Sequence, residues 1–126
     1  GALPQEALPA RYARAAIAVV PSLAEGFGLV VLEALGCGCA VVASDLPALR
    51  ALIADGYSGR LFPPGNPEAL AEALLALMRD PARVREYAAR GLEHAARNYH
   101  WDAVTGRYLA LYQRALGGDE SLSEAH

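Results

Sequence analysis

The sequence predicts an α/β fold: a partial doubly wound, Rossmann-like parallel sheet of about three strands, with helices on both faces and a helical C-terminal end. Three short apolar runs are separated by longer segments in which apolar residues recur at helical spacing. The chain has 126 residues, of which 54% are apolar and 20% charged, so it can bury a sizeable core. Strands that alternate with helices pair in parallel through right-handed crossovers, which place helices on both faces of the sheet.

The predicted strands lie at residues 16–21, 39–44 and 59–62. The first two read AIAVVP and CAVVAS, runs of small and β-branched residues that are typical of strands buried on both faces. The third, GRLF, is shorter and ends at the turn PPGNP. A sheet of three strands is small for this class, which indicates the trailing portion of a larger nucleotide-binding domain.

The connecting segments carry helix signals. Asn66 and Asp80 are helix-capping residues, and each is followed by a proline that suits the first position of a helix. Residues 1–116 are therefore expected to form a single α/β domain, and residues 117–126, GGDESLSEAH, a flexible polar tail. The predicted helices cover residues 29–38, where the closing glycines mark the stop, and residues 47–54, 67–79, 81–98 and 101–116.

Charge and hydropathy narrow the classes of function. The formal net charge is -3, and the eleven basic residues are arginines scattered from Arg11 to Arg114, so a basic patch for nucleic acid is not expected. No apolar run approaches the roughly 20 residues that span a bilayer, and the first residues do not resemble a secretory signal. We expect a cytoplasmic protein with no transmembrane segment and no nucleic-acid partner.

Cys37 and Cys39 are the only cysteines, separated by one glycine. Two cysteines are too few for a disulfide scaffold and supply fewer ligands than a zinc site needs. The three histidines are scattered, so we expect neither a metal site nor a cofactor. We interpret both cysteines as small buried residues; a redox or phosphate-sensing pair is the weaker alternative.

The loop PSLAEGFGL follows the first predicted strand, at the edge of the sheet where doubly wound proteins bind ligands. Gly26 and Gly28 allow the backbone to approach a ligand closely, and the helix that begins after them offers free N–H groups. A phosphate would fit this arrangement, although two glycines also occur in ordinary turns.

Two carboxylates accompany the glycines. Glu33 lies within LVVLEAL, a helix that is otherwise apolar on every face, so we expect it to be buried and to need partners such as sugar hydroxyls. A structural salt bridge to an arginine is the alternative for Glu33. Glu25 precedes the glycines at the mouth of the loop, where it can accept hydrogen bonds from a polar ligand.

Together these residues form the pattern E-x7-E, which resembles the signature of retaining glycosyltransferases of family four, the two-Rossmann-domain, GT-B type. The resemblance extends over most of the chain. It implies a donor site for a nucleotide sugar, with no separate cofactor and no essential metal. It places Glu25 beside the donor sugar as the catalytic residue and Glu33 at the nucleotide ribose. The substrate-binding residues that it implies are Glu25, Gly26, Phe27, Gly28, Leu29 and Glu33, the middle four mainly through backbone groups.

The resemblance also implies parts that this sequence lacks. The family's diphosphate clamp uses an arginine and a lysine that precede this segment, and the chain contains no lysine. The N-terminal acceptor domain and the first strands of the donor domain are missing too. We therefore expect the donor-binding portion of a retaining glycosyltransferase, a fragment that is inactive alone. The alternative is a non-enzymatic α/β scaffold or interaction domain that binds no nucleotide.

The missing strands lead to an expectation about assembly. The first strand would have an unpaired apolar edge, which is a template for pairing with another chain. Apolar residues of the last helix recur at helical spacing and would lack a partner. A homodimer is therefore expected, whereas a helix that folds back over the strand would give a monomer. The helix residues concerned are Trp101, Val104, Tyr108, Leu111 and Tyr112.

Overall fold

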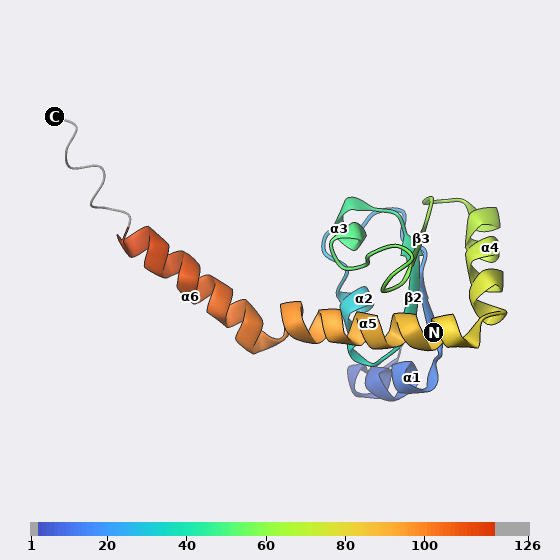
Figure 1. Ribbon diagram of the computed structural model, residues 1–126, viewed down its shortest axis with the longest axis horizontal. Coiled ribbons are helices and arrows are strands. Elements are labelled where there is room, and N and C mark those ends of the chain that lie inside the picture. The colour runs from blue at the N-terminus through green and yellow to red at the C-terminus, as the bar shows by residue number, and fades with distance from the viewer. Residues whose placement is uncertain (1–2, 118–126) are drawn as a thin grey trace.

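The computed structural model describes residues 3–117 and contains one three-stranded parallel sheet with helices around it (Figure 1). This confirms the predicted fold class. The elements are the 3₁₀-helix η1 (Gln5–Ala7), α1 (Leu8–Arg14), β1 (Ile17–Val20), α2 (Leu29–Gly36), β2 (Ala40–Ser44), α3 (Pro47–Arg50), β3 (Arg60–Phe62), α4 (Pro67–Met78), α5 (Pro81–Tyr99) and α6 (Trp101–Gly117).

The sheet has the strand order β1-β2-β3, so β2 is the central strand. Ile17 of β1 pairs with Ala40, and Arg60 of β3 pairs with Val42. Every residue of β2 is buried. Because successive side chains of a strand point to opposite faces, β2 contributes to a hydrophobic core on each face.

The two cores are built by different helices. On one face, residues of α2 and α3 pack against Val41 and Ala43. On the other face, residues of α4 pack against Ala40 and Val42. Helix α5 joins both cores, because Tyr87 belongs to the second and Ala95 to the first.

Gly91 lets α5 lie close to α2. A Cβ atom at this position would be 2.5 Å from Leu35 Cδ2 and 3.3 Å from the Ser58 carbonyl oxygen. Leu35 is fully buried, so it has little room to move away. Close contact between these two helices therefore depends on the missing side chain at residue 91.

Most predicted boundaries lie within one or two residues of those in the structure, and the largest difference is at α3. The helix expected over 47–54 is the shorter α3, since the amide of Ala54 donates to Ser58 Oγ at 3.0 Å and the chain turns there. The flexible tail expected over 117–126 lies, from residue 118 on, outside the described residues.

Helix α6 leads away from the sheet and does not fold back over β1 (Figure 1). Its only half-buried residues in 101–116 are Ala103 and Val104. Within residues 3–117, no helix has the length and apolar character needed to cross a lipid bilayer.

Candidate functional site

Residues 21–28, the glycine loop, connect the carboxyl end of β1 to the start of α2. Gly28 is the N-cap of α2 and has φ +90°, a left-handed conformation. A Cβ atom there would be 2.6 Å from Leu49 Cδ2 and 2.9 Å from Leu52 Cδ1. Both the conformation and the space therefore require glycine at this position.

The N-terminus of α2 has no side-chain cap. The Gly28 carbonyl oxygen accepts hydrogen bonds from the amides of Val31 and Leu32, at 3.0 and 3.1 Å. Leu29 and Val30, in the first helical turn, are exposed. Amides at the start of a helix lack intrahelical acceptors, and together with the helix dipole they favour an anion.

Glu25 turns back onto its own loop. Its Oε1 atom accepts hydrogen bonds from the amides of Gly26 and Phe27, at 3.1 and 3.5 Å. The Glu25 side chain is half-buried and Gly26 is exposed. The carboxylate therefore occupies two loop amides that a bound anion would otherwise contact.

Phe27 lies against a residue far away in the sequence. Its ring is 52% exposed and meets the Tyr99 ring edge-on, with centroids 6.4 Å apart. The Tyr99 hydroxyl donates to the Ala51 carbonyl oxygen at 3.2 Å, and the Arg107 guanidinium lies 6.0 Å from the centre of its ring. A cavity of about 570 Å³ separates Phe27 and Tyr99 from α6.

Glu33 is exposed, which corrects the expectation of a buried carboxylate. Helix α2 buries only Val31, Ala34 and Leu35, one stripe that faces β2 and α5. Glu33 lies outside this stripe, because an apolar sequence on every face does not make every face a contact surface. The alternative of a structural salt bridge also fails, since Glu33 forms no ion pair within residues 3–117.

Glu33 borders a small cavity of about 160 Å³ between α1 and α2. Burial, and next the negative charge of Glu33, raise the pKa of Tyr12, which lines the same cavity. No sequence motif indicates Tyr12, because none links it to a carboxylate 21 positions further on. Of the five main cavities in the described part of the chain, none is lined by both Glu25 and Glu33.

Cys39 is buried, as the sequence predicted, and its thiol donates hydrogen bonds inside the fold. Its Sγ donates to the carbonyl oxygens of Tyr12 and Ala15, at 3.1 and 3.4 Å. Burial, followed by the proximity of Cys37, raises the pKa of the Cys39 thiol and keeps it protonated. A protonated, buried thiol is a poor nucleophile, which disfavours the redox alternative. Cys37 is half-buried.

Asp45 follows β2 at the same edge of the sheet as the glycine loop. Arg50 binds both of its carboxylate oxygens, at 2.5 and 3.0 Å. The hydrogen bond from Arg50 lowers the pKa of Asp45. Asp45 is therefore engaged inside the chain and does not add a free carboxylate to the glycine loop.

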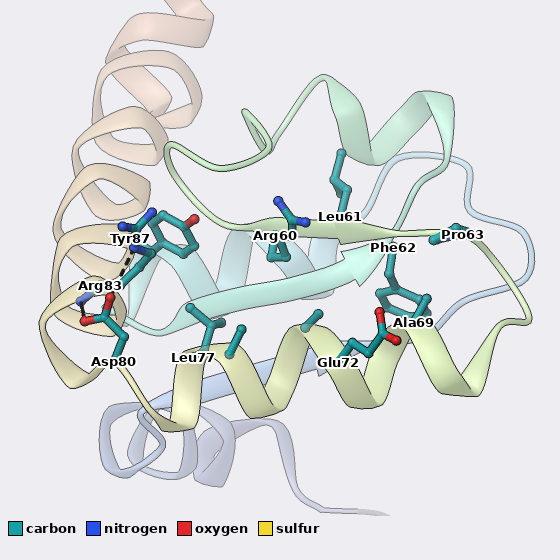
Figure 2. Close-up of a pocket in the computed structure, with 12 residues that line it drawn as sticks. Arg60, Leu61, Phe62, Pro63, Ala69, Glu72, Leu77, Asp80, Arg83 and Tyr87 are labelled. Carbon is teal, nitrogen blue, oxygen red and sulfur yellow. Dashed lines mark hydrogen bonds and ion pairs between the residues drawn. The ribbon is translucent and has the colours of Figure 1, made fainter.

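A second large cavity, of about 530 Å³, lies between β3, α4 and α5 (Figure 2). Its wall combines the buried Tyr87 with charged groups, among them an ion pair of Arg83 and Asp80 at 3.4 Å. No residue of the glycine loop or of α2 lines it. Among the residues that the structure describes, no group of three or more metal-ligating side chains is gathered.

The fold and the loop define a class. A parallel sheet that carries a glycine loop and an uncapped helix N-terminus at a strand's carboxyl end is the arrangement of nucleotide-binding α/β proteins. Residues 1–94 match the family Glycosyl transferases group 1. The chain belongs to this family.

Individual relatives agree with this result. The chain is 42% identical over 107 residues to D-inositol 3-phosphate glycosyltransferase 1 of Catenulispora acidiphila, covering 85% of this chain and 25% of the relative. It thus spans about a quarter of the length of this relative.

Solved structures share the fold. Sucrose-phosphate synthase of Thermosynechococcus elongatus has a TM-score of 0.84 and 34% identity, over 94% of this chain and 30% of that protein. HepE of Anabaena, solved in complex with UDP-glucose, has a TM-score of 0.74 and 27% identity, over 86% of this chain and 30% of HepE. These neighbours are of the GT-B type.

Proposed function

We propose that this chain is the nucleotide-sugar binding part of a retaining glycosyltransferase, which moves a glycosyl group from a nucleotide-activated donor to an acceptor. The observation that carries the proposal is the uncapped N-terminus of α2 behind the glycine loop, at the carboxyl end of β1. This position suits a diphosphate, whose negative charge matches the helix dipole and the free amides. The family match and the UDP-glucose complex of HepE support the donor class.

Each loop residue then has a role. Gly26, Phe27, Gly28 and Leu29 offer backbone amides to the diphosphate and the sugar, and the donor displaces the Glu25 carboxylate from the amides that it holds. The released Glu25 lies beside the donor sugar, and the exposed Glu33 binds the ribose hydroxyls.

The chemistry explains why amides are placed there. In the transfer step, the bond from the anomeric carbon to the diphosphate oxygen breaks, a bond to the acceptor oxygen forms on the same face, and the proton of the acceptor hydroxyl passes to the departing diphosphate. Negative charge develops on the departing diphosphate. Donors fixed in advance at the point where charge develops lower the barrier of such a step. The proposed reaction uses no separate cofactor and no essential metal.

The proposal assigns donor binding and acceptor binding to different domains. Residues 1–116 act as one α/β domain that binds the donor in the cytoplasm, and a separate N-terminal domain binds the acceptor. The chain alone therefore transfers no sugar. Incubation with radiolabelled UDP-glucose, GDP-mannose and several acceptors tests this point, and robust transfer by the isolated chain would show that the division is wrong.

Donor binding is tested by titrating UDP, GDP and ADP while following the backbone amide signals of residues 26–33 by NMR. We expect at least one nucleotide to shift the amides of residues 26–29. Glu33→Gln should leave folding intact and weaken this response, because a neutral amide loses the charge-assisted bonds to ribose hydroxyls. Glu72→Gln, on α4, is the matched control and should respond like the wild type. A flat wild-type response at millimolar nucleotide would refute donor binding.

One observation favours the scaffold alternative. The amides of Gly26 and Phe27 are already satisfied by Glu25 Oε1, as in a loop that serves only as a turn. Glu25→Gln separates the two functions. If the loop binds a donor, the weaker acceptor competes less for the amides and the nucleotide response is kept or strengthened; a scaffold gives no response in either form.

A further inference from the structure

The cavity between α1 and α2 is lined by Gln5, Leu8, Pro9, Tyr12, Glu33 and Cys37, and two of its polar side chains come from the two helices. Glu33 of α2 contributes a carboxylate, and Tyr12 of α1 contributes a phenol. Its volume of about 160 Å³ is smaller than a pocket for a whole small ligand, which takes about 300–1,000 Å³. It can accept one group of a larger ligand whose other parts lie outside.

Tyr12 is held firmly at this cavity. Its carbonyl oxygen accepts hydrogen bonds from Cys39 Sγ at 3.1 Å and from the Ala15 amide at 2.9 Å. Its ring packs against the core cluster on the α2 face of the sheet. The backbone and ring are thus fixed by contacts that do not involve the hydroxyl, and this hydroxyl makes no hydrogen bond within residues 3–117.

The surroundings keep the phenol in its neutral form. Burial and the nearby Glu33 both raise the pKa of Tyr12 above 10.0. At neutral pH the hydroxyl therefore retains its proton and can donate one hydrogen bond while it accepts others. Glu33, when ionised, only accepts. The pair is complementary to neighbouring hydroxyl groups, which donate to a carboxylate and accept from a phenol.

We propose that the Tyr12 hydroxyl is a second ribose-binding group, which contacts the ribose hydroxyls of the donor nucleotide together with Glu33. This inference rests on the proposed donor function and adds a residue to it. The cavity places the phenol and the carboxylate around one small space, and Cys39 holds the end of α1 that carries the phenol.

Tyr12→Phe tests the proposal, because it removes the hydroxyl and keeps the ring. The first probe is whichever of UDP, GDP and ADP shifts the loop amides, and the second is the 2′,3′-dideoxy form of that nucleotide. Calorimetry measures the affinity for each. The variant should bind the ribonucleotide about three- to tenfold more weakly, the loss expected for one hydrogen bond. Its affinity for the dideoxy nucleotide should equal that of the wild type. Tyr57→Phe is the matched control, since Tyr57 is exposed and lies against Arg90.

Each other result overturns the inference. An unchanged ribonucleotide affinity shows that the hydroxyl makes no contact, and an equal loss for both nucleotides shows a structural effect without ribose recognition. If Tyr12→Phe unfolds at the same temperature as the wild type, that structural effect is confined to the surroundings of residue 12. A wild-type chain that binds none of the three nucleotides refutes the proposed function itself, whereas normal nucleotide binding with no Tyr12 effect refutes only this inference.

Discussion

Among the elements that the structure describes, strand β2 and helix α6 are the two extremes of burial. Every residue of β2 is buried, whereas Trp101, Tyr108 and Leu116 of α6 are 80%, 57% and 82% exposed. Both segments are rich in apolar residues. The difference arises from their neighbours, since β2 lies between two strands and two layers of helices and α6 leads away from them. Apolar composition predicts a tendency to be buried, and topology decides whether a partner is present.

Truncation of a core leucine should have the largest effect. Leu35→Ala removes a fully buried side chain that meets Gly91 of α5. We expect it to lower the free energy of unfolding by about 2–5 kcal/mol, through lost burial and the cavity that remains. Leu109→Ala on α6, where the side chain is 56% exposed, should change it by less than about 0.5 kcal/mol. Urea denaturation measures both, and equal losses would abolish the contrast between the two regions.

Two glycine substitutions should change the stability of the fold in opposite directions. Gly28→Ala imposes a side chain at φ +90° against Leu49, so we expect destabilisation by about 1–3 kcal/mol. Gly106→Ala lies within α6, where a Cβ atom has nothing within 4 Å, so a better helix former should raise stability by up to about 1 kcal/mol. Thermal unfolding compares them. A stable Gly28→Ala variant would mean that the turn before α2 is not constrained as described.

Self-association of the chain should be the smallest effect. The surfaces involved should be α6 and the unpaired edge of β1. Val19 of β1 and Leu111 of α6 are 40% and 53% exposed. We expect a concentration-dependent homodimer, which sedimentation equilibrium detects as a rise above 13.3 kDa. Leu111→Glu should weaken it, because a charge on the apolar face resists burial. Gln113→Glu adds the same charge on the opposite side of the helix and should leave the dimer unchanged. A single 13.3 kDa species throughout would exclude the dimer.

The fold could be predicted from the sequence because short stretches of sequence specify its strands and helices. The runs predicted as strands at 16–21 and 39–44 contain β1 and β2 and exceed them by one or two residues. Asn66 and Asp80 cap α4 and α5 by accepting from the amides of Ala69 and Arg83, as their positions before proline indicated. Such signals act over a few residues and need no knowledge of the tertiary structure.

The site was accessible only in part. The glycine loop and the start of α2 follow from local sequence, but the exposure of Glu33 depends on which stripe of α2 faces β2 and α5. The contact of Phe27 with Tyr99 joins residues 72 positions apart. Tyr12 reaches the cavity of Glu33 because α1 packs on α2. Helix packing of this kind is set by the whole chain, so no local pattern contains it.

Helix α5 couples the two hydrophobic cores. It places Tyr87 in the core on one face of the sheet and Ala95 in the core on the other. Neither core can open while α5 stays in place, so the two layers should lose their amide protection against hydrogen exchange in one cooperative step. The glycine loop is thereby attached to a unit that opens as a whole, and its amides keep their relative positions while that unit stays folded.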